Sequence, residues 1–370
     1  MNQSPPSVVF VVGARPNFMK AAPVIAGLRE VRPDASITLV HTGQHYDDEM
    51  SAVFLDELKL PPVNAFLGIG SGTHAEQTAR ALVGVEGVLI DRRPQLVVVA
   101  GDVNSTLAAA LAAAKLDQPV AHIESGLRSF DETMPEEHNR RLTDHLSTLL
   151  FAHSPDALEN LAAEGIAADR VHLVGNTMID TLLGNVARAR AAEPWLELGL
   201  GPGEYGLVTL HRPALVDDDL LLAAVSTALA ELGSSFPLVF PAHPRTVAAL
   251  RRLGLERRLE GGSVLLTGPL SYVAFLGLEA EARFVLTDSG GVQEETTALG
   301  VRCFTLRDST ERPITVEQGT NLLLGADPDR IADIPTLLET PVSTEPIPLW
   351  DGSAGLRAAR VIAGFLAAAR

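Results

Sequence analysis

Short apolar runs alternate with amphipathic stretches along the first half of the chain. The apolar runs predict strands at residues 8–12, 36–40, 96–100 and 120–123, and the amphipathic stretches predict helices at 21–29 and 107–115. The run at 96–100 is continuously apolar, as expected of a parallel strand that is buried on both faces. This strand–helix–strand rhythm predicts a parallel sheet with right-handed crossover connections.

The second half repeats this rhythm. Strands are predicted at 207–210, 238–240, 264–266, 284–287 and 301–306, and helices at 218–232, 272–279 and 293–299. A chain of 370 residues is too long for one ordinary core and suits two. We therefore predict an α/β protein of two doubly wound, Rossmann-like domains, at 1–180 and 181–370. A last helix at about 355–370 follows a proline-containing connection, which would let it pack back on the first domain.

Polar or glycine-containing segments follow eight of the predicted strands. They lie at 13–17, 41–45, 101–102, 124–128, 211–213, 243–245, 288–291 and, after the last strand, at 307 and 311–313. Ligands of open α/β sheets bind outside the carboxyl ends of the strands. The recurrence in both halves predicts two Rossmann-like domains that face a central cleft, the GT-B architecture.

The segment Asp288-Ser289-Gly290-Gly291 is the strongest candidate for an anion site, because glycines let the backbone approach a phosphate at the start of a helix. The alternative is an ordinary strand-to-helix turn that Ser289 caps. Basic side chains at other strand ends favour a diphosphate when taken together: His211, Arg212, His243, Arg245 and Arg312.

Four carboxylates of the first half are candidates for proton transfer: Asp102, Glu124, Glu136 and Glu137. Asp102 has an alternative role as the N-cap of the following helix. Glu136 and Glu137 would also suit the first turn of a helix, where the dipole favours acids. Glu124 ends an apolar strand and therefore needs a partner.

The composition narrows the class of protein. A net charge of −17 argues against a nucleic acid or an anionic membrane as a partner. The single cysteine, Cys303, cannot form an intrachain disulfide and is predicted to be a buried thiol. The N-terminus has no signal-peptide pattern and no apolar run spans a bilayer, so we expect a cytoplasmic protein.

Motifs for common cofactors are missing from the sequence. The first strand lacks Gly-x-Gly-x-x-Gly, which argues against an NAD-dependent epimerase, and there is no P-loop. The histidines lack the spacing of metal ligands; His41 and His45 straddle a glycine turn and do not lie on a helix. We expect neither a cofactor nor a metal.

The polar segments together resemble the non-hydrolysing UDP-N-acetylglucosamine 2-epimerases. The resemblance rests on GARPNFMKAAP at 13–23, TGQH at 42–45, GD at 101–102, HIESGLR at 122–128, MPEEHNR at 134–140, GNT at 175–177, LHRP at 210–213, HPR at 243–245, TDSGGVQEE at 287–295 and TERP at 310–313. These motifs occur in family order and cover nearly the whole chain.

This resemblance implies a homodimeric GT-B enzyme that interconverts UDP-N-acetylglucosamine and UDP-N-acetylmannosamine by anti elimination of UDP and syn re-addition. The implied catalytic residues are Asp102 and Glu136 as acid/base groups, Glu124, which would orient the hexose or return a proton, and His211 at the departing diphosphate. The implied substrate-binding residues are Arg15, His243, Ser289 and Gly290 at the phosphates, Glu295 at the ribose, Phe275 at the uracil, and Lys20, Arg245, Gly291 and Arg312 in the same site.

Two departures from the family pattern bear on function. Ala214-Leu215 stands where many members have a polar pair, which leaves room for a related 2-acetamido sugar. The segments that bind a second, activating UDP-N-acetylglucosamine in some members read Gln44-His45-Tyr46-Asp47 and Gly70-Ser71-Gly72-Thr73 here, so we expect no activator site. Pro16-Asn17 favours the non-hydrolysing branch. The alternatives are a hydrolysing epimerase, a GT-B glycosyltransferase and a non-catalytic UDP-sugar-binding protein.

Overall fold

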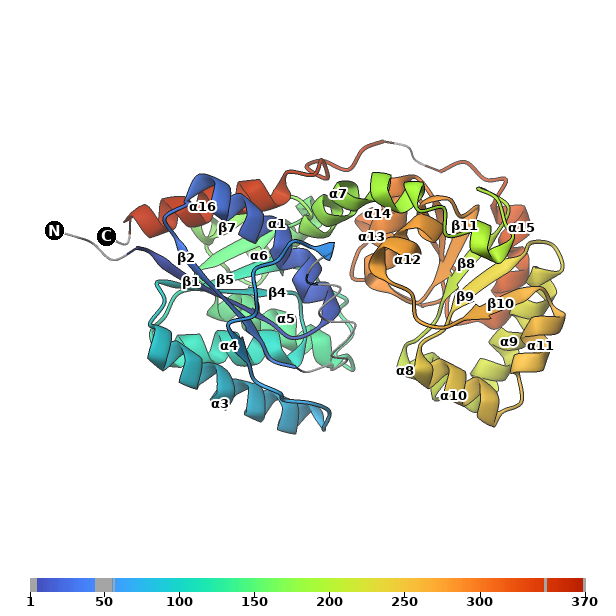
Figure 1. Ribbon diagram of the computed structural model, residues 1–370, viewed down its shortest axis with the longest axis horizontal. Coiled ribbons are helices and arrows are strands. Elements are labelled where there is room, and N and C mark those ends of the chain that lie inside the picture. Colours follow the sequence, from blue (N-terminus) through green and yellow to red (C-terminus); the bar gives the residue numbers. More distant parts are fainter. Residues whose placement is uncertain (1–4, 44–54, 56, 343–344, 369–370) are drawn as a thin grey trace. The chain divides into compact units, whose positions relative to one another are not determined.

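The computed structural model describes residues 5–43, 55, 57–342 and 345–368. The chain forms two compact units (Figure 1). Unit 1 comprises residues 1–181 and 348–370, and unit 2 comprises residues 182–347. The C-terminal stretch from Pro348 onward therefore belongs with the first unit, and it contains the last helix, for which packing on the first domain was predicted as a possibility.

Unit 1 is built on a parallel sheet of seven strands in the described part of the chain. Their order is β3-β2-β1-β4-β5-β6-β7. The strands are β1 (Ser7–Val12), β2 (Ser36–His41), β3 (Ala65–Phe66), β4 (Leu96–Ala100), β5 (Val120–Ser125), β6 (Leu149–Ala152) and β7 (Val171–Leu173). Every residue of β4 is buried, as its continuous apolar run predicts.

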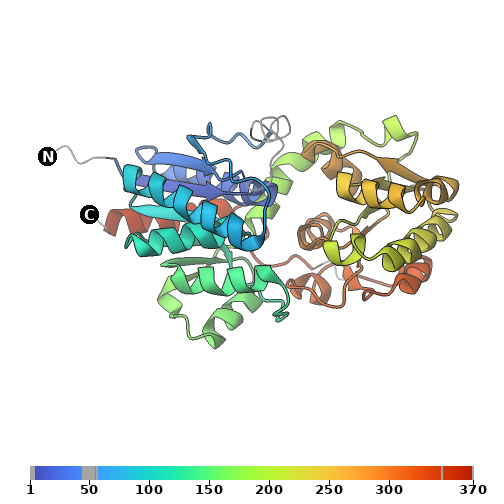
Figure 2. The same ribbon diagram turned by 90° about the horizontal axis from the view of Figure 1, so that it is seen from below.

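Helices cover both faces of this sheet (Figure 1 and Figure 2). One layer contains α3 (His74–Arg92), α4 (Asn104–Lys115) and α5 (Pro135–Leu146). The other contains α1 (Arg15–Val31) packed along α16 (Ala354–Ala368). The remaining helices of this part of the chain are α6 (Pro155–Ala163) and α7 (Thr177–Ala191), which crosses the boundary between the units.

The contact between α1 and α16 depends on small residues. A Cβ atom on Gly355 would lie 2.4 Å from the carbonyl carbon of Pro23, closer than real side chains allow. Asp180 of α7 accepts hydrogen bonds from the first backbone N–H groups of α16, at 3.1 Å from Ala354 and 2.7 Å from Gly355. Burial raises the pKa of the Asp180 carboxyl, against the effect of these two donors. Asp180 thus fixes the N-terminus of α16 on unit 1.

Unit 2 has a parallel sheet of six strands among the described residues, in the order β10-β9-β8-β11-β12-β13. The strands are β8 (Gly206–Thr209), β9 (Leu238–Pro241), β10 (Val264–Thr267), β11 (Phe284–Thr287), β12 (Arg302–Thr305) and β13 (Asn321–Leu323). The principal helices are α8 (Pro213–Val216), α9 (Asp219–Gly233), α10 (Pro244–Arg252), α11 (Glu256–Gly261), α12 (Tyr272–Ala280), α13 (Gly290–Leu299), α14 (Ile314–Glu317) and α15 (Ile334–Leu337).

Apolar side chains fill both faces of the second sheet. One cluster joins the sheet to α9, α10 and α11, and another joins it to α12 and α13 around Trp195 and Tyr205. Cys303 on β12 is fully buried, as predicted, and burial raises the pKa of its thiol to about 12. The two doubly wound sheets confirm the prediction of two Rossmann-like domains.

Three helices begin earlier than their apolar periodicity predicts. α1 starts at Arg15 rather than 21 because Pro16 suits the first helical turn. α13 starts at Gly290, within the glycine segment. α4 starts at Asn104 with Val103 at the N-cap, so the alternative that Asp102 caps this helix is wrong. Among the helices of the described chain, none has the length and apolarity that a membrane crossing requires.

Candidate functional site

The candidate residues cluster where the strand order of each sheet reverses. In unit 1 the reversal falls between β1 and β4, and the segments at 13–17 and 101–102 follow these strands. In unit 2 it falls between β8 and β11, which lead to the segments at 211–213 and 288–291. Such switch points open a crevice at the carboxyl edge of a parallel sheet and are the usual ligand sites of this fold class.

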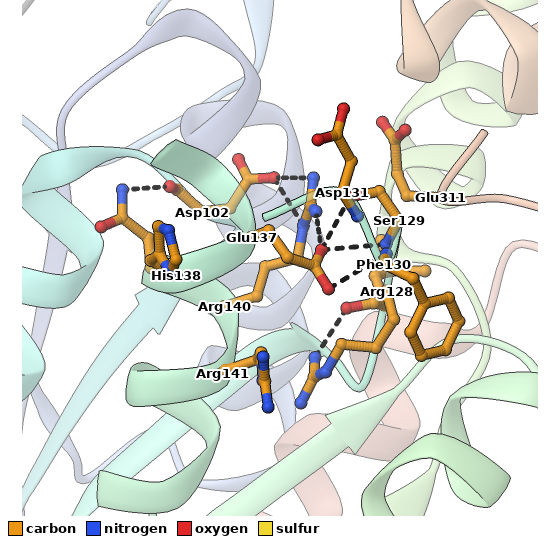
Figure 3. A network of polar contacts seen from close by, with 12 residues as sticks. Asp102, Arg128, Ser129, Phe130, Asp131, Glu137, His138, Arg140, Arg141 and Glu311 are labelled. Atoms are coloured by element: carbon orange, nitrogen blue, oxygen red, sulfur yellow. Dashed lines mark hydrogen bonds and ion pairs between the residues drawn. The ribbon is translucent and has the colours of Figure 1, made fainter. Parts of the chain in front are cut away.

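Asp102 is held from one side by Arg140 of α5 (Figure 3). Oδ2 of Asp102 accepts a hydrogen bond from Nε of Arg140 at 2.9 Å and forms an ion pair with Nη2 at 2.7 Å. The Asp102 side chain is 21% exposed, and its Oδ1 accepts no hydrogen bond from a residue that the structure describes. Asn139 donates to the backbone carbonyl of Asp102 at 2.8 Å. Asp102 is therefore held in place, and its Oδ1 has no donor among the described residues.

The neighbouring glutamates of α5 have different surroundings. Glu137 is buried and accepts from the backbone N–H of Ser129 at 2.9 Å, the Ser129 hydroxyl at 2.9 Å and the Phe130 N–H at 3.3 Å. These donors and Arg140 occupy its carboxylate, so Glu137 organises the loop before α5. Glu136 is half-buried, and its side chain makes no hydrogen bond or ion pair with the described residues. Only Glu136 of this pair remains a candidate for proton transfer.

Glu124 has the partner that its position at the end of a strand required. It forms a buried ion pair with Lys20 of α1. The backbone of Glu124 has a φ of 67°, and the pairing of β5 with β6 shifts register between Ile123 and Ser125. Such irregular, strained positions are common at functional sites. The ion pair lies against Gly101, where an added Cβ would approach the Lys20 Nζ to 2.9 Å.

A second buried network supports the backbone at Gly101. His122 of β5 hydrogen-bonds through Nε2 to the Gly101 carbonyl at 2.8 Å and through Nδ1 to Asp144 at 2.7 Å. Asp144 also pairs with Arg128 at 2.8 Å. Burial alone would raise the pKa of the Asp144 carboxyl, but His122 and Arg128 outweigh it and the pKa lies below its ordinary value. This network fixes the turn that carries Asp102.

In unit 2, Asp288 holds the segment that follows β8. Its Oδ2 accepts the backbone N–H groups of His211 at 2.9 Å and Arg212 at 2.8 Å, and its Oδ1 lies 3.0 Å from Nδ1 of His211. Burial alone would raise the pKa of the Asp288 carboxyl, but these contacts outweigh it and the pKa is lowered. The His211 side chain is 49% exposed. Asp288 thus orients the imidazole, with Nδ1 toward the carboxylate.

The turn at Ser289 and Gly290 lies beside arginine side chains. A Cβ on Gly290 would come within 2.3 Å of Nη1 of Arg312, so glycine permits this approach. Ser289 is the N-cap of α13, but its side chain does not cap the helix. The alternative that the Ser289 side chain caps this helix is therefore wrong, and the phosphate role of the turn stays a prediction.

Two further arginines lie in this part of unit 2. Arg212 and Arg307 both face Glu311, at 3.7 Å and 2.9 Å. The Arg307 side chain is only 10% exposed, and its Nη1 has no hydrogen-bond partner among the described residues. Burial and the neighbouring Arg307 lower the pKa of the Arg212 guanidinium. Both residues follow a predicted strand, and this position is the feature of the sequence that indicated them.

Other predicted binding residues lie apart from these contacts. His243 is the N-cap of α10, where its Nδ1 accepts from the Arg245 N–H at 3.2 Å, and Arg245 pairs with Asp217. Phe275 is half-buried against the core cluster of α12 and α13. Arg15 is exposed in the first turn of α1. Their roles toward a substrate stay predictions.

The structure describes only one of the two segments that correspond to the activator site of some family members. Gln44-His45-Tyr46-Asp47 lies outside the described residues. In the other segment, Thr73 is the N-cap of α3 and accepts from the Glu76 N–H at 3.2 Å, while Glu76 bonds back to the Thr73 N–H at 3.0 Å. Within the described chain, no group of three or more His, Cys, Asp and Glu side chains is arranged to hold a metal ion.

Glu295 of α13, the predicted ribose ligand, has an unusual neighbour. Glu279 of α12 is fully buried, and neither of its carboxyl oxygens has a hydrogen-bond partner in the described structure. Burial raises the pKa of Glu279 well above its ordinary value, and the charge of Glu295 raises it further. The folded chain therefore holds a proton at Glu279 up to a higher pH than the unfolded chain does.

We expect Glu279→Met to stabilise unit 2 by about 1–3 kcal/mol near pH 8. Because the folded pKa is raised, the free energy of unfolding of the wild type falls as pH rises above 4.5, and the variant escapes this loss. Urea unfolding in a Trp350→Phe background, followed by the buried Trp195 of unit 2, measures the effect. The exposed Glu260→Met is the control. A gain that does not shrink toward pH 5 would contradict the explanation.

Comparison with known proteins agrees with the motifs. The sequence profile of the UDP-N-acetylglucosamine 2-epimerase family matches residues 29–363. A UDP-N-acetylglucosamine 2-epimerase of Methanococcus maripaludis is 42% identical and covers 87% of this chain and 88% of its own. A UDP-2,3-diacetamido-2,3-dideoxy-D-glucuronate 2-epimerase of Pseudomonas aeruginosa is 41% identical, over 88% of this chain and 90% of its own.

The fold comparison points to the same class. The crystal structure of the Methanocaldococcus jannaschii UDP-GlcNAc 2-epimerase in complex with UDP-GlcNAc and UDP matches with a TM-score of 0.89 and 40% identity, over 97% of this chain and 99% of that one. Fold and motifs together define a nucleotide-sugar epimerase of the GT-B class. The chain belongs to the UDP-N-acetylglucosamine 2-epimerase family.

Proposed function

We propose that this chain is a non-hydrolysing UDP-N-acetylglucosamine 2-epimerase that forms UDP-N-acetylmannosamine reversibly. A base removes the C2 proton, the C1–O bond breaks as its electron pair leaves with UDP, and a C1=C2 double bond forms. UDP then adds back to C1 while a proton is returned to the opposite face of C2. A proton removed from C2 is replaced by another, and UDP is added back, so this cycle consumes neither water nor an oxidant.

The main support for this proposal is that the two units place different functional groups at their switch points. Unit 1 supplies Asp102 and Glu136, whose side chains leave, respectively, one carboxylate oxygen and the whole carboxylate without a partner among the described residues. Unit 2 supplies the Ser289 turn, its arginines and an oriented His211. Carboxylates suit proton transfer at C2, and an anion-binding turn suits a departing diphosphate.

The proposed residue roles combine these surroundings with the roles that the family motifs imply. Asp102 and Glu136 are the acid/base groups, because their carboxylates retain oxygens that can exchange a proton. Glu124 is tied to Lys20 and is assigned to the hexose. Ser289, Gly290 and Arg312 bind the diphosphate with His211. Arg15, His243, Arg245, Gly291, Phe275 and Glu295 complete the proposed UDP site.

The decisive experiment is incubation of the protein with UDP-N-acetylglucosamine in D2O without added cofactor, followed by proton NMR. Growth of UDP-N-acetylmannosamine with deuterium at C2 supports the proposal. Free N-acetylmannosamine as the only sugar product would instead identify a hydrolysing enzyme. UDP binding without turnover would point to a binding protein.

A second substrate is a specific alternative within the same chemistry. The 41% identical Pseudomonas aeruginosa relative is a UDP-2,3-diacetamido-2,3-dideoxy-D-glucuronate 2-epimerase. The same D2O experiment with that sugar nucleotide decides between them. Faster C2 exchange on the diacetamido sugar would move the assignment to it.

Velocity is expected to depend hyperbolically on UDP-N-acetylglucosamine concentration. The loop that would bind an activating second molecule uses Thr73 and Glu76 to cap α3 and contains no arginine. Initial-rate measurements over a range of substrate from well below to well above KM test this. A sigmoidal curve would contradict it.

We further propose a homodimer in which α3 contributes to the contact between copies. Val83 and Ile90, seven residues apart on α3, are 66% and 51% exposed. Apolar side chains on one helix face are typical of an interface. Light scattering should give twice 39.2 kDa for the wild type and 39.2 kDa for a Val83→Glu/Ile90→Glu variant. Leu220→Glu, at an exposed position of unit 2, is the control and should stay dimeric.

A further inference from the structure

Arg140 is a buried cation of unit 1 to which the proposed reaction gives no task (Figure 3). Its guanidinium is shared between two carboxylates. Nε and Nη2 both point at Oδ2 of Asp102, at 2.9 and 2.7 Å, while Nη1 donates to Oε2 of Glu137 at 2.7 Å. Three nitrogens of one planar group are thereby committed.

This sharing is asymmetric at Asp102. Arg140 engages Oδ2 twice and leaves Oδ1 without a donor in the described structure. A carboxylate that exchanges a proton with a carbon needs one oxygen at a defined position, because small misplacements are costly in rate. The guanidinium fork supplies that definition, and a single ammonium group cannot reproduce its planar geometry.

Glu137, the second carboxylate that contacts the Arg140 guanidinium, is also held in place. Glu137 accepts two hydrogen bonds from Ser129 and one from the Phe130 N–H, so it cannot rotate without breaking the loop before α5. Asn139 holds the backbone carbonyl of Asp102 at 2.8 Å. The ion pairs thus extend from an anchored loop to the unengaged oxygen of Asp102.

We propose that Arg140 is a positioning residue for epimerisation, which holds Oδ2 of Asp102 and presents Oδ1 to the C2 proton. This rests on the proposed function, because it takes Asp102 as a proton-transferring group. Arg140 itself touches no reacting atom. Its loss should therefore lower kcat and leave KM and the affinity for UDP nearly unchanged.

The test is Arg140→Lys, which keeps the positive charge and loses the fork. We expect kcat for UDP-N-acetylglucosamine to fall about 100-fold, with KM and the Kd for UDP within about twofold of wild type. The matched control is Arg141→Lys on the same helix, an exposed side chain whose ion pair with Glu132 is 3.2 Å long. This control should keep the wild-type kcat.

A second variant keeps the inference testable if Arg140→Lys folds poorly. Glu137→Gln can keep an oxygen at the position that accepts from Ser129 and Arg140, but it loses the acceptor of the Phe130 N–H and the negative charge that anchors Arg140. It should lower kcat about tenfold at unchanged KM. An unchanged kcat in either folded variant, or a loss of thermal stability alone, would overturn the role of Arg140. A wild-type protein that binds UDP but does not epimerise would overturn the proposed function, and this inference with it.

Discussion

Asp102→Asn should lower kcat by about 100- to 10,000-fold and leave the affinity for UDP unchanged. The amide keeps the shape of the side chain but cannot accept the C2 proton at neutral pH. Asp102 is not among the residues proposed to bind UDP, so the Kd for UDP should not respond to this substitution. Steady-state kinetics in both directions and calorimetry with UDP measure the two quantities.

The matched control for this prediction is Asp117→Asn. Asp117 is exposed in the same unit and has a φ of 54°, a conformation that asparagine tolerates well. It should have wild-type kinetics. If Asp102→Asn retains more than about a tenth of wild-type kcat, proton transfer must be assigned to Glu136 or Glu124 instead.

Lys20→Met should destabilise unit 1 by about 3–5 kcal/mol. The substitution leaves the Glu124 carboxylate buried without its cation, and an unpaired buried charge is much more costly than the pair. The double variant Lys20→Met/Glu124→Leu should recover most of the loss, because it removes both charges. The size of this recovery separates the cost of the orphaned charge from the cost of lost packing.

Trp350 lets this effect be measured in unit 1 alone. The chain has two tryptophans, Trp195 in unit 2 and Trp350 in unit 1, where its Nε1 donates to the His153 carbonyl at 3.1 Å. Urea unfolding in a Trp195→Phe background therefore reports on unit 1. The exposed Lys115→Met should change the free energy of unfolding by less than about 0.5 kcal/mol. An equally small change for Lys20→Met would show that the buried pair contributes little.

These two predictions test whether two carboxylates that follow neighbouring strands have different chemical roles. Glu124 and Asp102 both follow neighbouring strands, β5 and β4, yet their partners differ. Glu124 is neutralised by a buried ammonium group, whereas Asp102 shares an arginine and keeps an oxygen. The first arrangement favours a structural or orienting carboxylate, and the second favours one that exchanges a proton.

The sequence by itself determined the two Rossmann-like domains and the family. Apolar runs such as 96–100 and 284–287 became strands because a segment buried on both faces of a parallel sheet must be apolar throughout. Polar segments at strand ends fall at the ligand edge because parallel strands share their carboxyl edge. Both properties are local, so they can be predicted from the order of residues alone.

Only the tertiary structure decided which side chains meet. Asp288 reaches the N–H group of His211, 77 positions earlier, and Asp102 meets Arg140 across 38 positions. The sequence offered Asp102 as a helix cap and Glu137 as an acid/base group, and neither role survives the contacts. The order of strands in a sheet and the packing of helices on it are set by the whole chain. The periodicity of the sequence therefore predicted that the polar residues lie at the carboxyl edge of each sheet. Their partners, and the Asp102 oxygen that has no donor among the described residues, depend on the packing of the folded chain.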